Sequence, residues 1–181
     1  MRKVVATEYL SVDGVFQEPG QWSFPFWSDE AAKFKLDELF ASDLLLLGRV
    51  TYQGFAAAWP KMEADSAGFS ERMNNLPKYV ASRTLRKLDW NNSRLIEGDL
   101  PDAVRKLKQE SGKDILIGGS GDVVNQLLQE DLIDELRIML YPIVLGGGKR
   151  LFRDGAKKPL RLAKTDALGK GVVVLHYEPA R

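Results

Sequence analysis

Hydrophobic and polar positions change along the chain in short blocks that predict strands and helices in alternation. Short apolar runs predict strands over residues 4–10, 44–47, 79–81, 94–96, 115–117 and 135–144. A closing pair of strands is expected on either side of a turn at residues 169–171. Apolar positions at helical spacing, together with Ser28 as a cap and Pro101 in a first turn, predict helices over residues 28–40 and 101–109 and from residues 51 and 123.

This order of elements predicts an α/β fold of three layers. Strands separated by helices favour a mixed, mostly parallel central sheet with helices on both faces. The last two strands are joined too tightly to be parallel, so antiparallel strands are expected at the C-terminal edge. The length of 181 residues, of which 44% are hydrophobic, favours a single domain over residues 1–181.

Composition narrows the classes of function. The chain has 26 Lys and Arg against 25 Asp and Glu, a net charge of +1, so no nucleic-acid partner is expected. Because there is no cysteine and His176 is the single histidine, no metal site is expected, and His176 is interpreted as structural. No apolar stretch approaches the roughly 20 residues of a membrane helix, and the first apolar run breaks at Thr7, too early for a signal sequence. We expect a cytoplasmic protein with no membrane partner.

The most informative segment is residues 114–128, where an apolar run, a glycine cluster and an amphipathic run follow one another. This order predicts strand, loop and helix, and the free N–H groups at the start of such a helix attract an anion such as phosphate. The dinucleotide fingerprint of the Rossmann fold would need a glycine at Val124, and no Lys-Ser or Lys-Thr pair completes a P-loop. The alternative is that the glycines only form a tight turn, with Asp122 as the helix cap.

Polar residues also follow the neighbouring predicted strands. In an open, mostly parallel sheet, ligands bind at the carboxyl ends of the strands. Two arginines, several hydroxyls and a helix N-terminus at one edge suit a nucleotide with a pyrophosphate and a further phosphate. The candidate cofactor-binding residues are Gly48, Arg49, Thr51, Ser82, Arg83, Gly118, Gly119, Ser120, Gly121 and Asp122.

These residues resemble a known family. Gly48-Arg-Val-Thr51, Ser82-Arg83 and Gly118-Gly119 are similar to the NADPH-binding elements of the dihydrofolate reductase fold. The motifs Ser11-Val-Asp-Gly14 and Leu132-Ile-Asp-Glu-Leu136, with residues 141–152, resemble the C-terminal reductase domain of the bifunctional riboflavin-biosynthesis deaminase-reductase. Because the deaminase half needs zinc-binding cysteines, the resemblance is to a reductase domain that stands alone.

The resemblance implies a dihydrofolate-reductase-like fold and a function. It implies an NADPH-dependent oxidoreductase that acts on a small pterin, pyrimidine or related heterocycle. It also implies a homodimer, because the counterpart of residues 141–152 lies in a part of the fold associated with subunit pairing. The alternative is a non-catalytic nucleotide-binding protein that kept the cofactor site.

Two carboxylates and a group of aromatic residues in the first loop and the following helix are the candidates for contact with the substrate. Asp13 and Glu30 are the candidate catalytic residues, because a carboxyl group in an apolar pocket can hold the proton that accompanies hydride transfer. For Asp13, a role in an Asp-Gly turn is the alternative. Four aromatic residues could wall a flat heterocyclic pocket or close the core beneath the first loop: Trp22, Phe24, Phe26 and Trp27.

Overall fold

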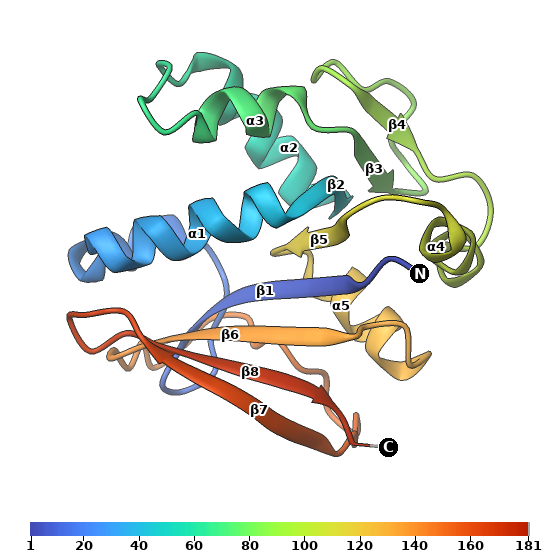
Figure 1. Ribbon diagram of the computed structural model, residues 1–181. Helices are drawn as coiled ribbons and strands as arrows, with labels where there is room; N and C mark the ends of the chain where they lie inside the picture. The colour runs from blue at the N-terminus through green and yellow to red at the C-terminus, as the bar shows by residue number, and fades with distance from the viewer. Residues whose placement is uncertain (181) are drawn as a thin grey trace.

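The computed structural model describes residues 1–180 and contains one eight-stranded sheet (Figure 1). The strands are β1 (Val4–Ser11), β2 (Ser42–Gly48), β3 (Lys78–Ala81), β4 (Ser93–Leu95), β5 (Asp114–Gly118), β6 (Glu135–Tyr141), β7 (Leu160–Ala167) and β8 (Val173–Pro179). Their order across the sheet is β4-β3-β2-β5-β1-β6-β8-β7. The first six strands are parallel, whereas β8 is antiparallel to β6 and β7 is antiparallel to β8. The predicted mixed sheet with antiparallel C-terminal strands is confirmed.

Helices cover both faces of the sheet, as the sequence predicted. They are α1 (Asp29–Ala41), α2 (Arg49–Ala58), α3 (Phe69–Asn75), α4 (Leu100–Gln109) and α5 (Gly121–Gln129). Apolar residues of α4 and α5 pack with Val4 and Ala6 on one face. Apolar residues of α1, α2 and α3 pack with Val5 on the other face. Because side chains alternate along β1, this single strand contributes to both halves of the core.

The structure differs from the predicted elements in several bounds and in one helix, and α5 begins at Gly121, two residues before its predicted start. The second helix begins at Arg49, two residues before the predicted start. The sequence did not predict α3, whose start is held by Asp65, because its carboxylate accepts hydrogen bonds from three backbone N–H groups of residues 67–70. Strand β6 ends at Tyr141, three residues before the predicted end, because Pro142 has no N–H to continue the ladder. None of the helices within residues 1–180 combines the length and the apolar character that a membrane crossing requires.

Candidate active site

The parallel strands end together at one edge of the sheet, and the predicted cofactor residues follow them there. Gly48 at the end of β2 is paired with Ala81 at the end of β3, so Arg49 and Ser82 leave adjacent strands. On the other side, Gly118 at the end of β5 is paired with Thr7 of β1. The structure therefore brings the three predicted motifs to one edge.

The glycine turn, which we define as residues 119–121 after β5, is fixed by hydrogen bonds to the end of β2 and the start of α2. The Gly48 N–H donates to Ser120 Oγ over 2.8 Å, and the Ser120 N–H donates to Thr51 Oγ1 over 2.9 Å. Gly119 has a φ of +61°, and a Cβ at this position would stand 3.0 Å from Thr51 Oγ1. Glycine is therefore required at 119 both by the backbone conformation and by the close approach of α2.

The N-terminus of α5 carries no side-chain cap among the described residues. Its N-cap is Ser120, whose side chain accepts no hydrogen bond from the first helical turn. Asp122, which the alternative interpretation made the helix cap, does not cap it, because its carboxylate accepts a hydrogen bond from Arg153 at 2.7 Å. That hydrogen bond lowers the pKa of Asp122, so the carboxylate is ionised. The first N–H groups of α5 remain available for an anion.

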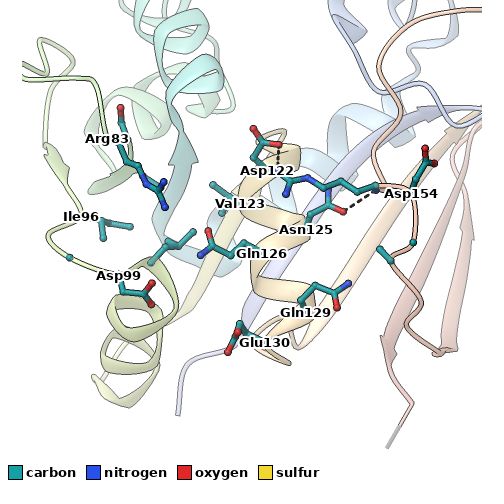
Figure 2. Close-up of a pocket in the computed structure, with 17 residues that line it drawn as sticks. Arg83, Ile96, Asp99, Asp122, Val123, Asn125, Gln126, Gln129, Glu130 and Asp154 are labelled. Carbon is teal, nitrogen blue, oxygen red and sulfur yellow. Dashed lines mark hydrogen bonds and ion pairs between the residues drawn. The ribbon is translucent and has the colours of Figure 1, made fainter.

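A cavity of about 860 Å³ extends from this edge along α5 (Figure 2). In Figure 2, Arg83 and Ile96 face Val123 and Gln126 of α5 across the cavity. The apolar side chains of Ile96 and Val123 suit the flat face of a nucleotide base, and the guanidinium of Arg83 suits a phosphate. Among the predicted cofactor residues, Ser82, Arg83 and Asp122 line the cavity, whereas Arg49 is exposed on α2, where it donates to Gln53 Oε1 over 3.2 Å.

The structure separates the two predicted catalytic carboxylates. Asp13 accepts hydrogen bonds from Ser11 Oγ at 2.6 Å and from the N–H groups of Leu145 and Gly146 at 3.1 and 2.9 Å. The hydrogen bond from Ser11, followed by those from the two backbone groups, lowers the pKa of Asp13 to about 2. An ionised carboxylate with these partners is a poor proton donor. The turn interpretation fits this geometry: Asp13 ties the first loop to residues 145–146.

Glu30 lies in the first turn of α1 and is exposed. It faces the turn between β7 and β8, because a Cβ added at Gly169 would stand 3.2 Å from Glu30 Oε2. Asp13 therefore contacts residues 145–146, and Glu30 lies beside the turn between β7 and β8. The catalytic role of Asp13 and Glu30 stays a prediction.

The aromatic residues of the first loop divide between core and surface. Trp22 is buried and meets Tyr141 edge-on, with ring centroids 5.4 Å apart. Phe26 packs against the same ring at 6.2 Å, whereas Phe24 is 70% exposed. Of the two interpretations left open by the sequence, closure of the core beneath the loop describes Trp22 and Phe26.

Sequence reasoning missed a network of buried charges between α1 and β6. Lys35 Nζ donates to the Glu38 carboxylate and, over 3.2 Å, to Thr7 Oγ1. Glu38 also accepts a hydrogen bond from Arg137 at 3.2 Å, and Arg137 donates to Glu135 at 2.7 Å. The spacing of three residues between Lys35 and Glu38 was a signal, but the partners on β6 lie about a hundred positions away in sequence.

The network continues through the single histidine. His176 Nδ1 lies 2.8 Å from Glu135 and Nε2 lies 2.9 Å from Asp166, so the ring bridges β6 and β7. Burial raises the pKa of Glu135, but the hydrogen bonds from Arg137 and His176 outweigh it and hold the pKa at about 2. These contacts agree with the structural interpretation of His176. Within residues 1–180, no group of three or more acidic or histidine side chains is placed to hold a metal ion.

Comparison with known proteins agrees with this geometry. The model of the RibD C-terminal domain family matches residues 2–174. The chain is 32% identical over 144 residues to the uncharacterized protein YyaP of Bacillus subtilis (strain 168), an alignment that covers 78% of this chain and 76% of YyaP.

Two solved structures are similar across nearly the whole chain. A protein assigned to riboflavin biosynthesis from Shewanella sp. PV-4 superposes with a TM-score of 0.77, at 22% identity and with 99% of each chain covered. Dihydrofolate reductase from Enterococcus faecalis, complexed with NADP(H) and RAB-propyl, gives a TM-score of 0.66 at 13% identity, covering 99% of this chain and 97% of that enzyme. The fold is therefore the predicted dihydrofolate-reductase-like fold.

Proposed function

The chain belongs to the RibD C-terminal domain family, and on that premise we propose that it is an NADPH-dependent reductase of a small pterin, pyrimidine or related heterocycle. The family and the fold are those of reductases. A bound nicotinamide supplies a hydride in such a reaction, and the protein supplies orientation and a proton.

One observation carries the proposal: the uncapped N-terminus of α5 beside a glycine turn that two hydrogen bonds fix. The hydrogen bonds from Gly48 to Ser120 and from Ser120 to Thr51 hold the turn in place before any ligand arrives. A diphosphate needs free N–H donors and a close approach of the backbone, and this turn offers both. The cavity beside α5 offers room for an adenosine next to that diphosphate.

Arg49 and Arg83 are the proposed contacts to the further phosphate of NADPH. They follow β2 and β3, whose ends are paired, and both side chains are exposed. No Asp or Glu pairs with either guanidinium within residues 1–180. An arginine without a carboxylate partner is free to grip a phosphate.

The test has a binding arm and a turnover arm. Titration followed by cofactor fluorescence is expected to give tighter binding of NADPH than of NADH. Loss of the reduced-nicotinamide absorbance is then followed with a panel of pterins, pyrimidines and related heterocycles, of which at least one should be reduced. NADPH binding without turnover of any compound would favour the non-catalytic alternative, and the absence of NADPH binding would contradict the proposal.

We also propose that the protein is a homodimer through residues 141–152. In this segment Val144 is 69% exposed and Phe152 is 43% exposed, which leaves apolar surface for a partner. Light scattering at micromolar concentration should give twice the mass of the 20.3 kDa chain. A mass of one chain would contradict the dimer without affecting the proposed reductase activity.

A further inference from the structure

Lys35 is a cation enclosed between α1 and β1. Its side chain is only 13% exposed, and its ammonium lies 5.5 Å from the centroid of the Tyr9 ring. Lysine is seldom enclosed in this way unless its charge is paired. Here the charge is paired with Glu38, and the Thr7 hydroxyl accepts a further hydrogen bond.

The position of Thr7 places this ammonium near the proposed cofactor site. Thr7 is paired with Gly118, the last residue of β5 before the glycine turn. The side chains of Thr7 and Tyr9 lie on the α1 face of the sheet, where Lys35 reaches them, whereas α5 packs on the opposite face. An ammonium therefore stands beside β1 at the level where the glycine turn begins.

The hydrogen bonds of Lys35 leave one donor unused. An ammonium has three N–H donors, and the acceptors of Lys35 within residues 1–180 are Glu38 and Thr7. Glu38 is shared with Arg137, which holds the carboxylate in place. The third N–H has no hydrogen-bond acceptor in the described part of the chain.

We propose that Lys35 is the catalytic residue that donates the proton in the proposed reduction, and that the group reduced is a carbonyl; this assignment rests on the proposed reductase function. The carbonyl carbon accepts a hydride from the reduced nicotinamide, and the electron pair of the C=O π bond moves to the oxygen. That oxygen takes a proton from Lys35, which recovers one from water, leaving an alcohol and the oxidised nicotinamide.

The charge of Lys35 selects the substrate class. A positive group stabilises the negative charge that develops on a carbonyl oxygen during hydride addition. A protonated ring nitrogen would be repelled by the same ammonium. With Asp13 ionised in its loop and Glu30 at the β7–β8 turn, two enclosed groups that can carry a proton remain at β1: Lys35 and the buried carboxyl of Glu8, whose pKa burial raises. Of the two, only Lys35 carries the positive charge that stabilises a developing alkoxide.

A purely structural role makes a different prediction. If Lys35 only ties α1 to β1, its loss would lower stability and would affect binding and turnover together. If it donates a proton, Lys35→Gln should lower kcat by about 10²-fold or more while the KM and the affinity for NADPH stay unchanged. The matched control is Lys33→Gln, which removes an exposed lysine from the same helix and should change none of these values.

Chemical rescue separates the two roles further. Turnover of Lys35→Ala with a carbonyl-bearing heterocycle should rise when ethylammonium is added, because a free amine can occupy the vacated space and donate the proton. Thermal melting of each variant shows that the comparison is made on folded protein. If Lys35 has only a structural role, ethylammonium should not raise the turnover of Lys35→Ala at a temperature where this variant is folded.

The possible outcomes are distinct. If the protein binds NADPH and reduces carbonyl compounds, but Lys35→Gln keeps the full kcat, the assignment of Lys35 fails and the proposed function stands. Reduction of ring C=N bonds alone, or NADPH binding with no carbonyl compound turned over, also overturns the assignment. Failure to bind NADPH overturns the proposed function and the assignment with it.

Discussion

Two regions of the sheet carry polar chemistry of different kinds. The edge formed by the ends of β2, β3 and β5 is built from backbone N–H groups, glycines and hydroxyls, as in the hydrogen bonds around Ser120. The region between α1 and strands β6 and β8 is built from enclosed charges that run from Lys35 to His176. The geometry of the first region is set by backbone conformation. The stability of the second region requires that each enclosed charge has a partner of opposite charge.

The two regions should therefore respond differently to substitution. A hydrogen bond between neutral groups contributes about 1 kcal/mol, so losing one contact at the glycine turn costs the fold little. Removing one member of a buried ion pair leaves its partner charged without compensation, which costs about 3–5 kcal/mol. We expect changes at the glycine turn to act on ligand binding. Changes in the charge network should act on stability, with Lys35, for which a role in turnover is proposed, as the exception.

The largest effect is expected for Arg137→Met. Arg137 is 16% exposed at its side chain and donates to both Glu38 and Glu135, so its loss removes a guanidinium partner from two enclosed carboxylates and leaves them with Lys35 and His176 alone. The free energy of unfolding, measured by urea denaturation, should fall by about 3–5 kcal/mol.

Arg105→Met is the matched control for this variant. Arg105 also bonds two carboxylates, Asp102 and Glu130, but its side chain is 44% exposed. Its loss should lower the free energy of unfolding by no more than about 1 kcal/mol. If both variants lose the same free energy of unfolding, the network between α1 and β6 contributes no more to stability than an exposed ion pair.

Gly119→Val should impair ligand binding at the first region, the edge that contains the glycine turn. Gly119 has a φ of +61°, and the new side chain would meet Thr51 and occupy the space where the backbone approaches a phosphate. The affinity for NADPH, measured by fluorescence titration, should fall by about 10²-fold. Separately, the strained backbone should lower the free energy of unfolding by roughly 1–3 kcal/mol.

The control is Gly146→Val, at a glycine with a similar φ of +75° and nothing within 4 Å of an added Cβ. It should carry comparable backbone strain, visible in thermal melting, and keep its affinity for NADPH. If both variants bind NADPH normally, the glycine turn has only a conformational role, as in the alternative interpretation of the sequence.

The sequence predicted the first region far better than the second. The glycine cluster at 118–121 and the polar residues after Gly48 and Ala81 are local motifs, and parallel strands bring them together whatever their spacing in the chain. The family resemblance added the cofactor and the fold, and the fold is confirmed. The parallel order of the strands followed from their alternation with helices.

The second region could not be predicted, because its contacts join residues far apart in sequence. Glu38 and Arg137 are 99 positions apart, and neither stands in a motif. Asp13 was recognisable as part of Ser11-Val-Asp-Gly14, and Ser11 of that motif donates one of its hydrogen bonds, but the other two depend on residues 145 and 146 folding back over it. Helix α3 was missed because its start depends on Asp65 and not on an apolar period.

The charge network should also show in the dependence of stability on pH. The pKa of Glu135 lies at about 2 in the folded protein, below its ordinary value of 4.5. A lowered pKa stabilises the fold above pH 4.5, and this stabilisation is lost as the pH falls toward 2. The contribution is about 2 kcal/mol when partial solvent screening is allowed for.

Glu135→Gln removes this titration. Between pH 4.5 and pH 2, the free energy of unfolding should therefore fall less steeply in Glu135→Gln than in the unmodified protein. Glu97→Gln, at an exposed position, should keep the original slope. An unchanged slope in Glu135→Gln would mean that the hydrogen bonds from Arg137 and His176 do not favour the ionised form.

The smallest effect is expected at the rim of the first region, where Arg49 and Arg83 are proposed to distinguish NADPH from NADH. A hydrogen bond to a charged group contributes at least about 1.5 kcal/mol, which is roughly tenfold in affinity. Arg83→Ala or Arg49→Ala should therefore weaken the binding of NADPH alone. The dissociation constant of NADH divided by that of NADPH should fall by about tenfold.

Arg86→Ala is the control, because Arg86 is exposed on the same segment as Arg83 but does not line the cavity. It should leave the ratio unchanged, and binding of NADH should be the same in all three variants because NADH lacks the phosphate. Equal dissociation constants for NADPH and NADH in the unmodified protein would remove the reason for assigning either arginine to the phosphate. A loss of NADH affinity in Arg83→Ala would place Arg83 on a part of the dinucleotide that both cofactors share.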